Sequence, residues 1–288
     1  MKSIKNYIET YIETHLNTCL ESLLDDDDTF LDPENDKKII EDWIKNNYII
    51  TGKLTVDGLA VNCTGDVTVK NALITSLTNG FGWGKVGGNF DCSDCENIRS
   101  LEGAPKEVGG NFYCSYCVNL TSLKGAPKEV GGCFDCSGCK NLTSLEYTPK
   151  GVGGYFNCDG CENLKTLEGV TKEIRKDFYC RKCNNLISLE GAPKKVGGSF
   201  NCGGCENLKT LDGAPKEVGG FYCRKCNKIA SLEGGPKEVV GSFNCSNCDN
   251  LKSLKGAPEF KFKGTLMCMN CKNLKITDSD RKKYKIKD

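Results

Sequence analysis

The chain has 288 residues, among them 21 cysteines, 33 glycines and 8 prolines, and its formal net charge is +1. This near-neutral balance gives no basis for contact with nucleic acid or with an anionic membrane surface. No apolar run approaches the ~18 residues that a membrane-spanning helix needs, and the opening Met1–Glu9 has no apolar signal-peptide core. We therefore expect a protein that is not exported by a signal peptide, so that its thiols stay reduced.

The first segment, residues 1–47, is expected to be helical and to cap or tether the rest of the chain. A stripe of Ile and Leu side chains recurs at helical spacing, and the acidic run Asp25–Asp28 is expected to end that helix. Asp32 then precedes Pro33, as an N-cap precedes a first turn, and this predicts a second helix that continues through Ile44.

Residues 48–85 have a different character. The segments Leu54–Val56 and Val67–Val69 alternate as strands do. Val67–Val69 and Leu77 also fall near positions that recur later in the chain. We interpret 48–85 as a degenerate first repeat that caps an array.

Nine Cys-x-x-Cys pairs follow at almost constant spacing. Their first cysteines are Cys92, Cys114, Cys136, Cys158, Cys180, Cys202, Cys223, Cys245 and Cys268. Five consecutive steps are of 22 residues, and the next three are of 21, 22 and 23. A fixed period in this range indicates stacked repeats. We expect a nine-repeat solenoid over residues 86–275, followed by a lysine-rich C-terminal tail or short cap over 276–288.

The repeat Val108–Pro127 shows how one coil would form. With Phe112 counted as zero, apolar residues fall at positions 0, 2, 5, 8 and 11. The step of two predicts a short strand with Phe112 and Cys114 on the same face, and the steps of three predict a chain that curls round a core. The Gly-Gly pair before the strand would form a tight corner, and Pro127 would favour an extended return over a helix.

The pattern F-x-C-x-x-C-x-x-L-x-x-L resembles the leucine-rich-repeat signature L-x-L-x-x-N/C-x-x-L, with the second cysteine of each pair at the buried N/C position. The segment Leu120–Pro127 is similar to the proline-containing return of the short bacterial class. This resemblance implies a β-rich solenoid with one parallel sheet, an extended convex side and a concave binding face. The chain departs from the family in its Phe and Cys at Leu positions, in its Gly-Gly pairs, and in Gly169–Asp177, which has neither Pro nor Gly-Gly.

Both cysteine columns are predicted to be buried thiols that pack as small apolar side chains, because both occupy inward positions and adjacent strands lie ~4.8 Å apart. Two alternatives stay open: neighbouring pairs could bind zinc through four thiolates, or stacked cysteines could form a disulfide ladder. Redox catalysis is disfavoured, since nine copies of one active site have no rationale. Cys133 occupies an outward position and is a candidate reactive surface thiol, whereas Cys19 is expected to pack beside the first helix.

No catalytic constellation is evident in the sequence. His15 is the only histidine, so serine–histidine and cysteine–histidine pairs are not available. The Gly-Gly pairs lack the strand–G-x-G-x-x-G–helix context of a phosphate loop. We expect a non-enzymatic protein with no catalytic residues, no cofactor and no metal site, which binds a protein partner and neither nucleic acid nor a membrane.

Binding is expected on the concave face, where outward-pointing strand residues gather. This face begins with acidic residues such as Asp91 and Asp135 and becomes richer in Tyr, Arg and Lys along the array. Tyr and Arg are enriched at interface hot spots. The predicted partner-binding residues are Tyr113, Tyr116, Tyr179, Arg181, Lys182, Tyr222, Arg224 and Lys225.

The opening Met1–Glu9 resembles the capsid-targeting leader of some internal head proteins of large tailed phages, which is cut after a glutamate. That resemblance implies a bacterial or phage origin, and a location in the cytoplasm of a bacterial host or inside a virion, with a phage particle or a host protein as partner. A packaged structural protein of a phage and a zinc-binding, cysteine-rich protein are therefore rival functions.

Overall fold

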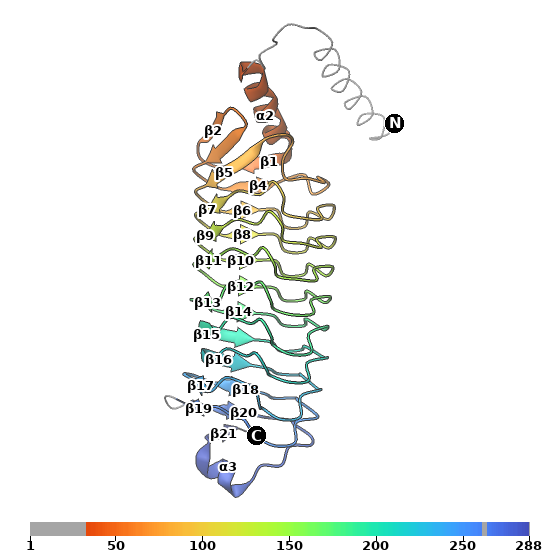
Figure 1. Ribbon diagram of the computed structural model, residues 1–288, viewed down its shortest axis with the longest axis vertical. Helices are drawn as coiled ribbons and strands as arrows, with labels where there is room; N and C mark the ends of the chain where they lie inside the picture. Colours follow the sequence, from red (N-terminus) through yellow and green to blue (C-terminus); the bar gives the residue numbers. More distant parts are fainter. Residues whose placement is uncertain (1–32, 261–263, 288) are drawn as a thin grey trace.

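The computed structural model describes residues 33–260 and 264–287, which form one elongated rod of stacked coils (Figure 1). Each coil is one sequence repeat of about 22 residues, so the predicted β-solenoid is confirmed. The first predicted helix, the leader Met1–Glu9, the acidic run Asp25–Asp28, His15 and Cys19 lie outside the described residues. Of the helices in the described part of the chain, none is long and apolar enough to cross a bilayer.

The first of two strand columns carries the phenylalanines, and its strands pair in parallel with like residues opposite each other, as in Phe112 and Phe134. This first column consists of β4 (Val67–Val69), β6 (Phe90–Asp91), β8 (Phe112–Tyr113), β10 (Phe134–Asp135), β12 (Phe156–Asn157), β14 (Phe178–Tyr179), the C-terminal parts of β15 (Lys195–Asn201) and β16 (Glu217–Tyr222), β18 (Phe243–Asn244), β20 (Leu266–Met267) and β21 (Ile286–Lys287).

A second column of short parallel strands runs beside the first, which refines the expectation of one parallel sheet (Figure 1). It consists of β5 (Gly82–Val86), β7 (Glu107–Val108), β9 (Glu129–Val130), β11 (Gly151–Val152), β13 (Glu173–Ile174), the N-terminal parts of β15 and β16, β17 (Glu238–Val239) and β19 (Glu259–Phe260). In β15 and β16 the chain stays extended through the corner, so the two columns join there. The predicted extended return of each coil thus contains a strand of its own.

The core is a set of ladders in which each residue stacks on its equivalent in the next coil. The rings from Phe90 to Phe243 are fully buried, and neighbouring ring centroids lie 5.1 to 5.5 Å apart. Leu120 and Leu123 complete the interior with no exposed surface, and their equivalents from Ile98 to Leu254 are buried as well. The predicted inward positions are therefore correct.

The cysteines form two further buried ladders, as predicted. Of the 20 cysteines in the described residues, all are buried except Cys133 and Cys271, which are partly exposed. From the second pair onward, the second thiol of each pair donates a hydrogen bond to the backbone carbonyl of the first cysteine one coil earlier; the Cys117 Sγ lies 3.2 Å from the Cys92 oxygen. This bond recurs at 3.1 to 3.3 Å down the array, so these thiols serve as donors between coils.

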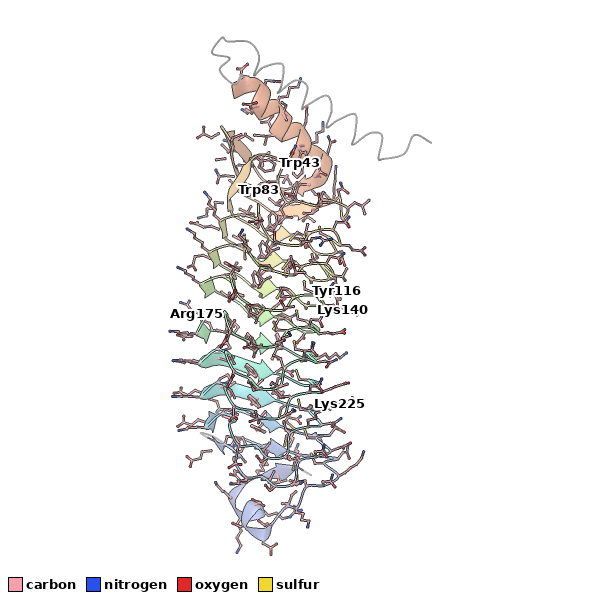
Figure 2. All side chains as sticks on the ribbon, turned by 45° about the vertical axis from the view of Figure 1, so that its right-hand side comes forward. Trp43, Trp83, Tyr116, Lys140, Arg175 and Lys225 are labelled. Carbon is pink, nitrogen blue, oxygen red and sulfur yellow. The ribbon has the colours of Figure 1, made fainter. Side chains whose placement is uncertain are left out.

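The Gly-Gly pairs allow neighbouring coils to approach closely. A Cβ at Gly109 would collide with the carbonyl oxygen of Gly87, and a Cβ at Gly131 with that of Gly109. Because strands stack at the same spacing in both columns, neither side of a coil is wider than the other. The rod consequently does not bend into a horseshoe, and a nearly flat side takes the place of the expected concave face (Figures 1 and 2).

The N-terminal end of the rod is covered by a helix and two antiparallel pairings. The covering elements are α2 (Pro33–Asn47), β1 (Tyr48–Ile50) paired with β4, and β2 (Leu54–Asp57) paired with β3 (Ala60–Cys63). Helix α2 confirms the second predicted helix and buries Ile40 and Ile44. The Tyr48 hydroxyl donates to the Leu77 carbonyl at 2.7 Å, and its ring packs 5.4 Å from that of Trp83. Polar and apolar contacts together therefore close this end.

The C-terminal end carries α3 (Asp278–Lys283) and β21, within the range expected to be a tail or cap. Thr277 caps α3, because its side chain accepts from the Asp280 backbone while the Asp280 carboxylate accepts from the Thr277 backbone. The Tyr284 ring is nearly buried and lies edge-on to Phe260, at a centroid distance of 6.3 Å. These contacts hold the last segment against the final coils.

Candidate protein-binding site

The three predicted strand tyrosines lie on the outer face of the first column. Tyr113, Tyr179 and Tyr222 each follow a buried phenylalanine, and strand residues alternate between faces, so these rings point outward and are half-buried. In the ladder, Tyr113 lies between Asp91 and Asp135 of the adjacent coils. The outer face is therefore a mixed aromatic and acidic surface.

Each Cys-x-x-Cys pair contains a left-handed residue in the turn that follows the strand, two positions after the first cysteine. These residues, with φ between 55° and 76°, are Asp94, Tyr116, Gly138, Gly160, Lys182, Gly204, Lys225, Asn247 and Asn270. Glycine adopts this conformation freely, whereas other L-residues in it are destabilised by roughly 1–2 kcal/mol. Tyr116, Lys182 and Lys225 occupy the position against the backbone preference, and strain of this kind is concentrated at binding sites.

A groove of about 640 Å³ follows these turns from the coil of Tyr116 to the coil of Arg224. Tyr116, Lys140 and Lys225 lie along the same side of the rod in Figure 2. Five of the eight predicted partner-binding residues line the groove: Tyr116, Arg181, Lys182, Arg224 and Lys225. Tyr113, Tyr179 and Tyr222 do not line it and lie on the adjoining sheet face. The predicted partner-binding residues therefore belong to two neighbouring surfaces, the groove and the adjoining sheet face, and not to a single surface.

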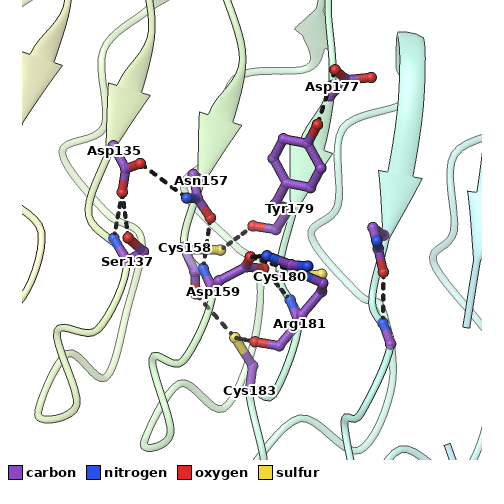
Figure 3. Close-up of polar contacts among 12 residues, drawn as sticks. Asp135, Ser137, Asn157, Cys158, Asp159, Asp177, Tyr179, Cys180, Arg181 and Cys183 are labelled. Carbon is purple, nitrogen blue, oxygen red and sulfur yellow. Dashed lines mark hydrogen bonds and ion pairs between the residues drawn. The ribbon is translucent and has the colours of Figure 1, made fainter. Parts of the chain in front are cut away.

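Arg181 is anchored in the groove by the coil before it. Its Nε and Nη2 both lie 2.6 Å from the Asp159 Oδ2, and its backbone N–H donates to Oδ1 of the same carboxylate (Figure 3). The hydrogen bond to Asp159 raises the pKa of Arg181 above its ordinary value. The guanidinium also lies 5.9 Å from the centre of the Tyr179 ring. Arg181 therefore joins the groove to the tyrosine face, by which we mean the outer face of the first column that carries Tyr113, Tyr179 and Tyr222.

Two residues of the tyrosine face were missed from sequence. The Tyr179 hydroxyl donates to the Asp177 Oδ2 at 3.0 Å (Figure 3), and the Tyr155 ring lies edge-on to Tyr179 with centroids 5.9 Å apart. Burial, with Asp135 nearby, raises the pKa of Tyr155 to about 12. Tyr155 and Asp177 precede a phenylalanine instead of following it. Because strand residues alternate between faces, the residue before each phenylalanine points outward like the residue after it. The sequence pattern could therefore have identified Tyr155 and Asp177.

The groove has an excess of unpaired cations. Its two acidic side chains are engaged, Asp159 with Arg181 and Glu162 with Lys140 at 3.4 Å. Lys182, Arg224 and Lys225 are exposed, and no side-chain hydrogen bond or ion pair links them to any other described residue. The three free cations give this edge of the rod a local positive charge.

The buried cysteine ladders are thiols of low reactivity. Burial raises the pKa of Cys114 well above its usual range, and that of Cys95 to about 12. Cys271 differs, because a hydrogen bond with the Cys245 thiol lowers its pKa to about 7. Over the described ranges, no group of three or more His, Cys, Asp and Glu side chains is arranged to hold a metal ion.

Comparison with known proteins gave no match: no protein-family model fits the chain, and no curated protein or solved structure is significantly similar to it. The likeness to leucine-rich repeats is therefore limited to the repeat length and the pattern of inward residues. The resemblance of Met1–Glu9 to phage leaders concerns residues outside the described part of the chain.

Proposed function

We propose that this chain is a non-enzymatic repeat scaffold that binds an acidic segment of a protein partner along the groove. The observation that carries the proposal is the set Lys182, Arg224 and Lys225, three exposed cations without a described partner in one groove. Two of them, Lys182 and Lys225, occupy left-handed positions that three other coils fill with glycine.

The form of the groove favours a macromolecule over a small ligand. Small molecules are bound in concave pockets that bury most of their surface. Directly behind the groove, Phe178, Cys180 and Cys183 are fully buried in packed ladders, so the groove follows the surface and does not enter the core. An extended segment lying across several coils would contact such a surface along its whole length.

Rigidity of the scaffold supports the same conclusion. The turns are held by coil-to-coil backbone hydrogen bonds, such as that from the Lys182 N–H to the Gly203 oxygen at 3.1 Å. A preorganised backbone reduces the entropy lost on binding. Arg181 and Tyr116 then supply the guanidinium and aromatic groups that are enriched at interface hot spots.

A capture experiment tests the proposal. Immobilised wild-type protein and a groove variant with Lys182→Gly, Arg224→Ala and Lys225→Gly are exposed to the same extract of the producing cells, and the captured proteins are quantified by mass spectrometry. We expect at least one acidic protein to be retained by the wild type and depleted on the variant. Equal capture by both would refute binding in the groove.

A further inference from the structure

A second charged surface lies on the other side of the rod, where a lysine precedes each strand of the second column from β7 to β17. These exposed lysines are Lys106, Lys128, Lys150, Lys172, Lys194, Lys216 and Lys237. Backbone hydrogen bonds hold many of them in register, as from the Lys128 N–H to the Lys106 oxygen at 2.9 Å. In most coils a glutamate follows the lysine, so the charges of these two side chains cancel.

Three consecutive coils depart from this pattern, and every departure makes them more positive. Gly151 and Lys195 stand where glutamate is usual, and Arg175 and Lys176 stand where most other coils have Gly-Gly. The three coils therefore carry six cations and a single acidic side chain, Glu173, at these positions. We term this surface the basic flank, and its members are Lys150, Lys172, Arg175, Lys176, Lys194 and Lys195. Arg175 projects from the side of the rod opposite Tyr116 and Lys225 (Figure 2).

The second column is interrupted within the basic flank. Strand β11 pairs only with β9, and β13 only with β15, so no ladder joins β11 to β13. At the position of Arg175 most other coils have glycine, and a Cβ at Gly153 would collide with the Gly131 carbonyl oxygen. Arg175 carries a Cβ at this position, and no ladder of the second column joins its coil to the coil before it. The Lys150 oxygen instead accepts from the Thr171 hydroxyl at 3.0 Å.

The interruption opens a cleft of about 420 Å³. Lys150 and Arg175 provide its positive charge, and the Glu129 carboxylate lies where a side chain at Gly151 would be. Two carboxylates, Glu129 and Glu173, also line the cleft. The Glu173 carboxylate lies 4.0 Å from the Lys195 ammonium, so Glu173 is partly neutralised within the basic flank.

We propose that the basic flank, centred on the cleft between β11 and β13, binds a short, extended, carboxylate-rich peptide segment. Three coils spaced ~4.8 Å apart span the length of only about three to four residues of extended chain, so the bound segment is short. Nucleic-acid interfaces usually bury roughly 600 Å² or more and use aromatic stacking for single strands. None of the residues lining the cleft is aromatic. Glu129 and Glu173 would repel a continuous phosphate backbone, whereas a peptide can place neutral residues opposite them.

The test uses full-length protein and, as probe, a fluorescein-labelled octapeptide of alternating glutamate and glycine, with binding measured by anisotropy at low salt. The flank variant carries Arg175→Gly, Lys176→Gly and Lys195→Glu. These are the residues that other coils have at the same positions, so the variant is expected to fold. Its matched control, Lys165→Glu with Lys209→Glu, makes the same change in net charge at two exposed positions elsewhere. We expect the probe to bind the flank variant at least about tenfold more weakly than the wild type or the control.

The groove also carries free cations, so the titrations are repeated in the groove variant described above. Retention of a flank-dependent signal there supports the second site even if the groove binds nothing. Three results would overturn the proposal: equal affinity of wild type and flank variant, an equal loss in the charge-matched control, or tighter binding of an eight-nucleotide thymidine oligomer or of polyphosphate than of the glutamate–glycine octapeptide.

Discussion

The guanidinium of Arg181 is bound to the carboxylate of Asp159 one coil earlier, with two of its nitrogens 2.6 Å from the same oxygen. The Asp159 side chain is only 15% exposed, whereas that of Arg181 is 55% exposed. The pair therefore joins two coils and holds one wall of the groove. Replacing Arg181 alone would disturb both the stacking and the binding surface, so the groove variant leaves this residue unchanged.

A double-mutant cycle on this pair tests the contact between the coils. We expect Asp159→Ala to lower the free energy of unfolding by about 1 kcal/mol, because a half-exposed ion pair is screened by solvent. The coupling energy with Arg181→Ala, measured by urea unfolding, should be of similar size and should shrink at high salt. A coupling energy of zero at low salt would show that the pair does not form in solution.

Replacing the strained lysines with glycine should stabilise the fold. Removal of the left-handed strain of Lys182 should outweigh the extra entropy of glycine in the unfolded chain, for a net gain of about 0.5–1 kcal/mol. The same gain is expected for Lys225→Gly. Gly160→Lys is the matched control and should lower stability by a comparable amount. If Lys182→Gly destabilises the protein, the lysine side chain stabilises the fold by more than its left-handed backbone conformation destabilises it.

Much of the core could be predicted from sequence, because the period of about 22 residues and the alternation of Phe112 with Cys114 specify the inward face. The second column could not be predicted, since a two-residue strand such as Glu107–Val108 is too short to show the alternation of apolar and polar residues that marks a strand. The flat side of the rod follows from that unseen column. Contacts between coils, such as that of Asp159 with Arg181, join residues 22 positions apart and depend on the stacking register. The sequence identified five residues of the groove but not which of its side chains form ion pairs.

The reactivity of the thiols should follow their burial. Treatment of the native protein with a thiol reagent at pH 7.5 should modify Cys271 first and Cys133 next, because these two are the partly exposed cysteines of the described chain and Cys271 has a pKa of about 7. Peptide mass spectrometry should find the core cysteines, such as Cys114 and Cys117, unmodified until the protein is denatured. Rapid native labelling of these two would mean that the inward register is wrong.

Stability should decrease at alkaline pH. Burial holds the pKa of Cys114, Cys158 and Cys180 well above the ordinary value, so the folded state keeps these thiols protonated. The unfolded state ionises them above about pH 8.5 and is thereby favoured. Stability is therefore complete below that pH and falls as the pH rises further. Urea unfolding with a reductant at pH 7, 8, 9 and 10 should show a falling midpoint, and a constant midpoint would contradict the burial of the thiols.

Binding in the groove is tested by the affinity of a purified, captured partner for wild-type protein and for the groove variant with Lys182→Gly, Arg224→Ala and Lys225→Gly. Isothermal titration at two salt concentrations should show binding to the wild type that weakens with salt. For the variant we expect a loss of at least about tenfold, because cationic contacts to an acidic segment are removed, at equal or higher thermal stability. Unchanged affinity in a folded variant would contradict the assignment of the groove as the binding site.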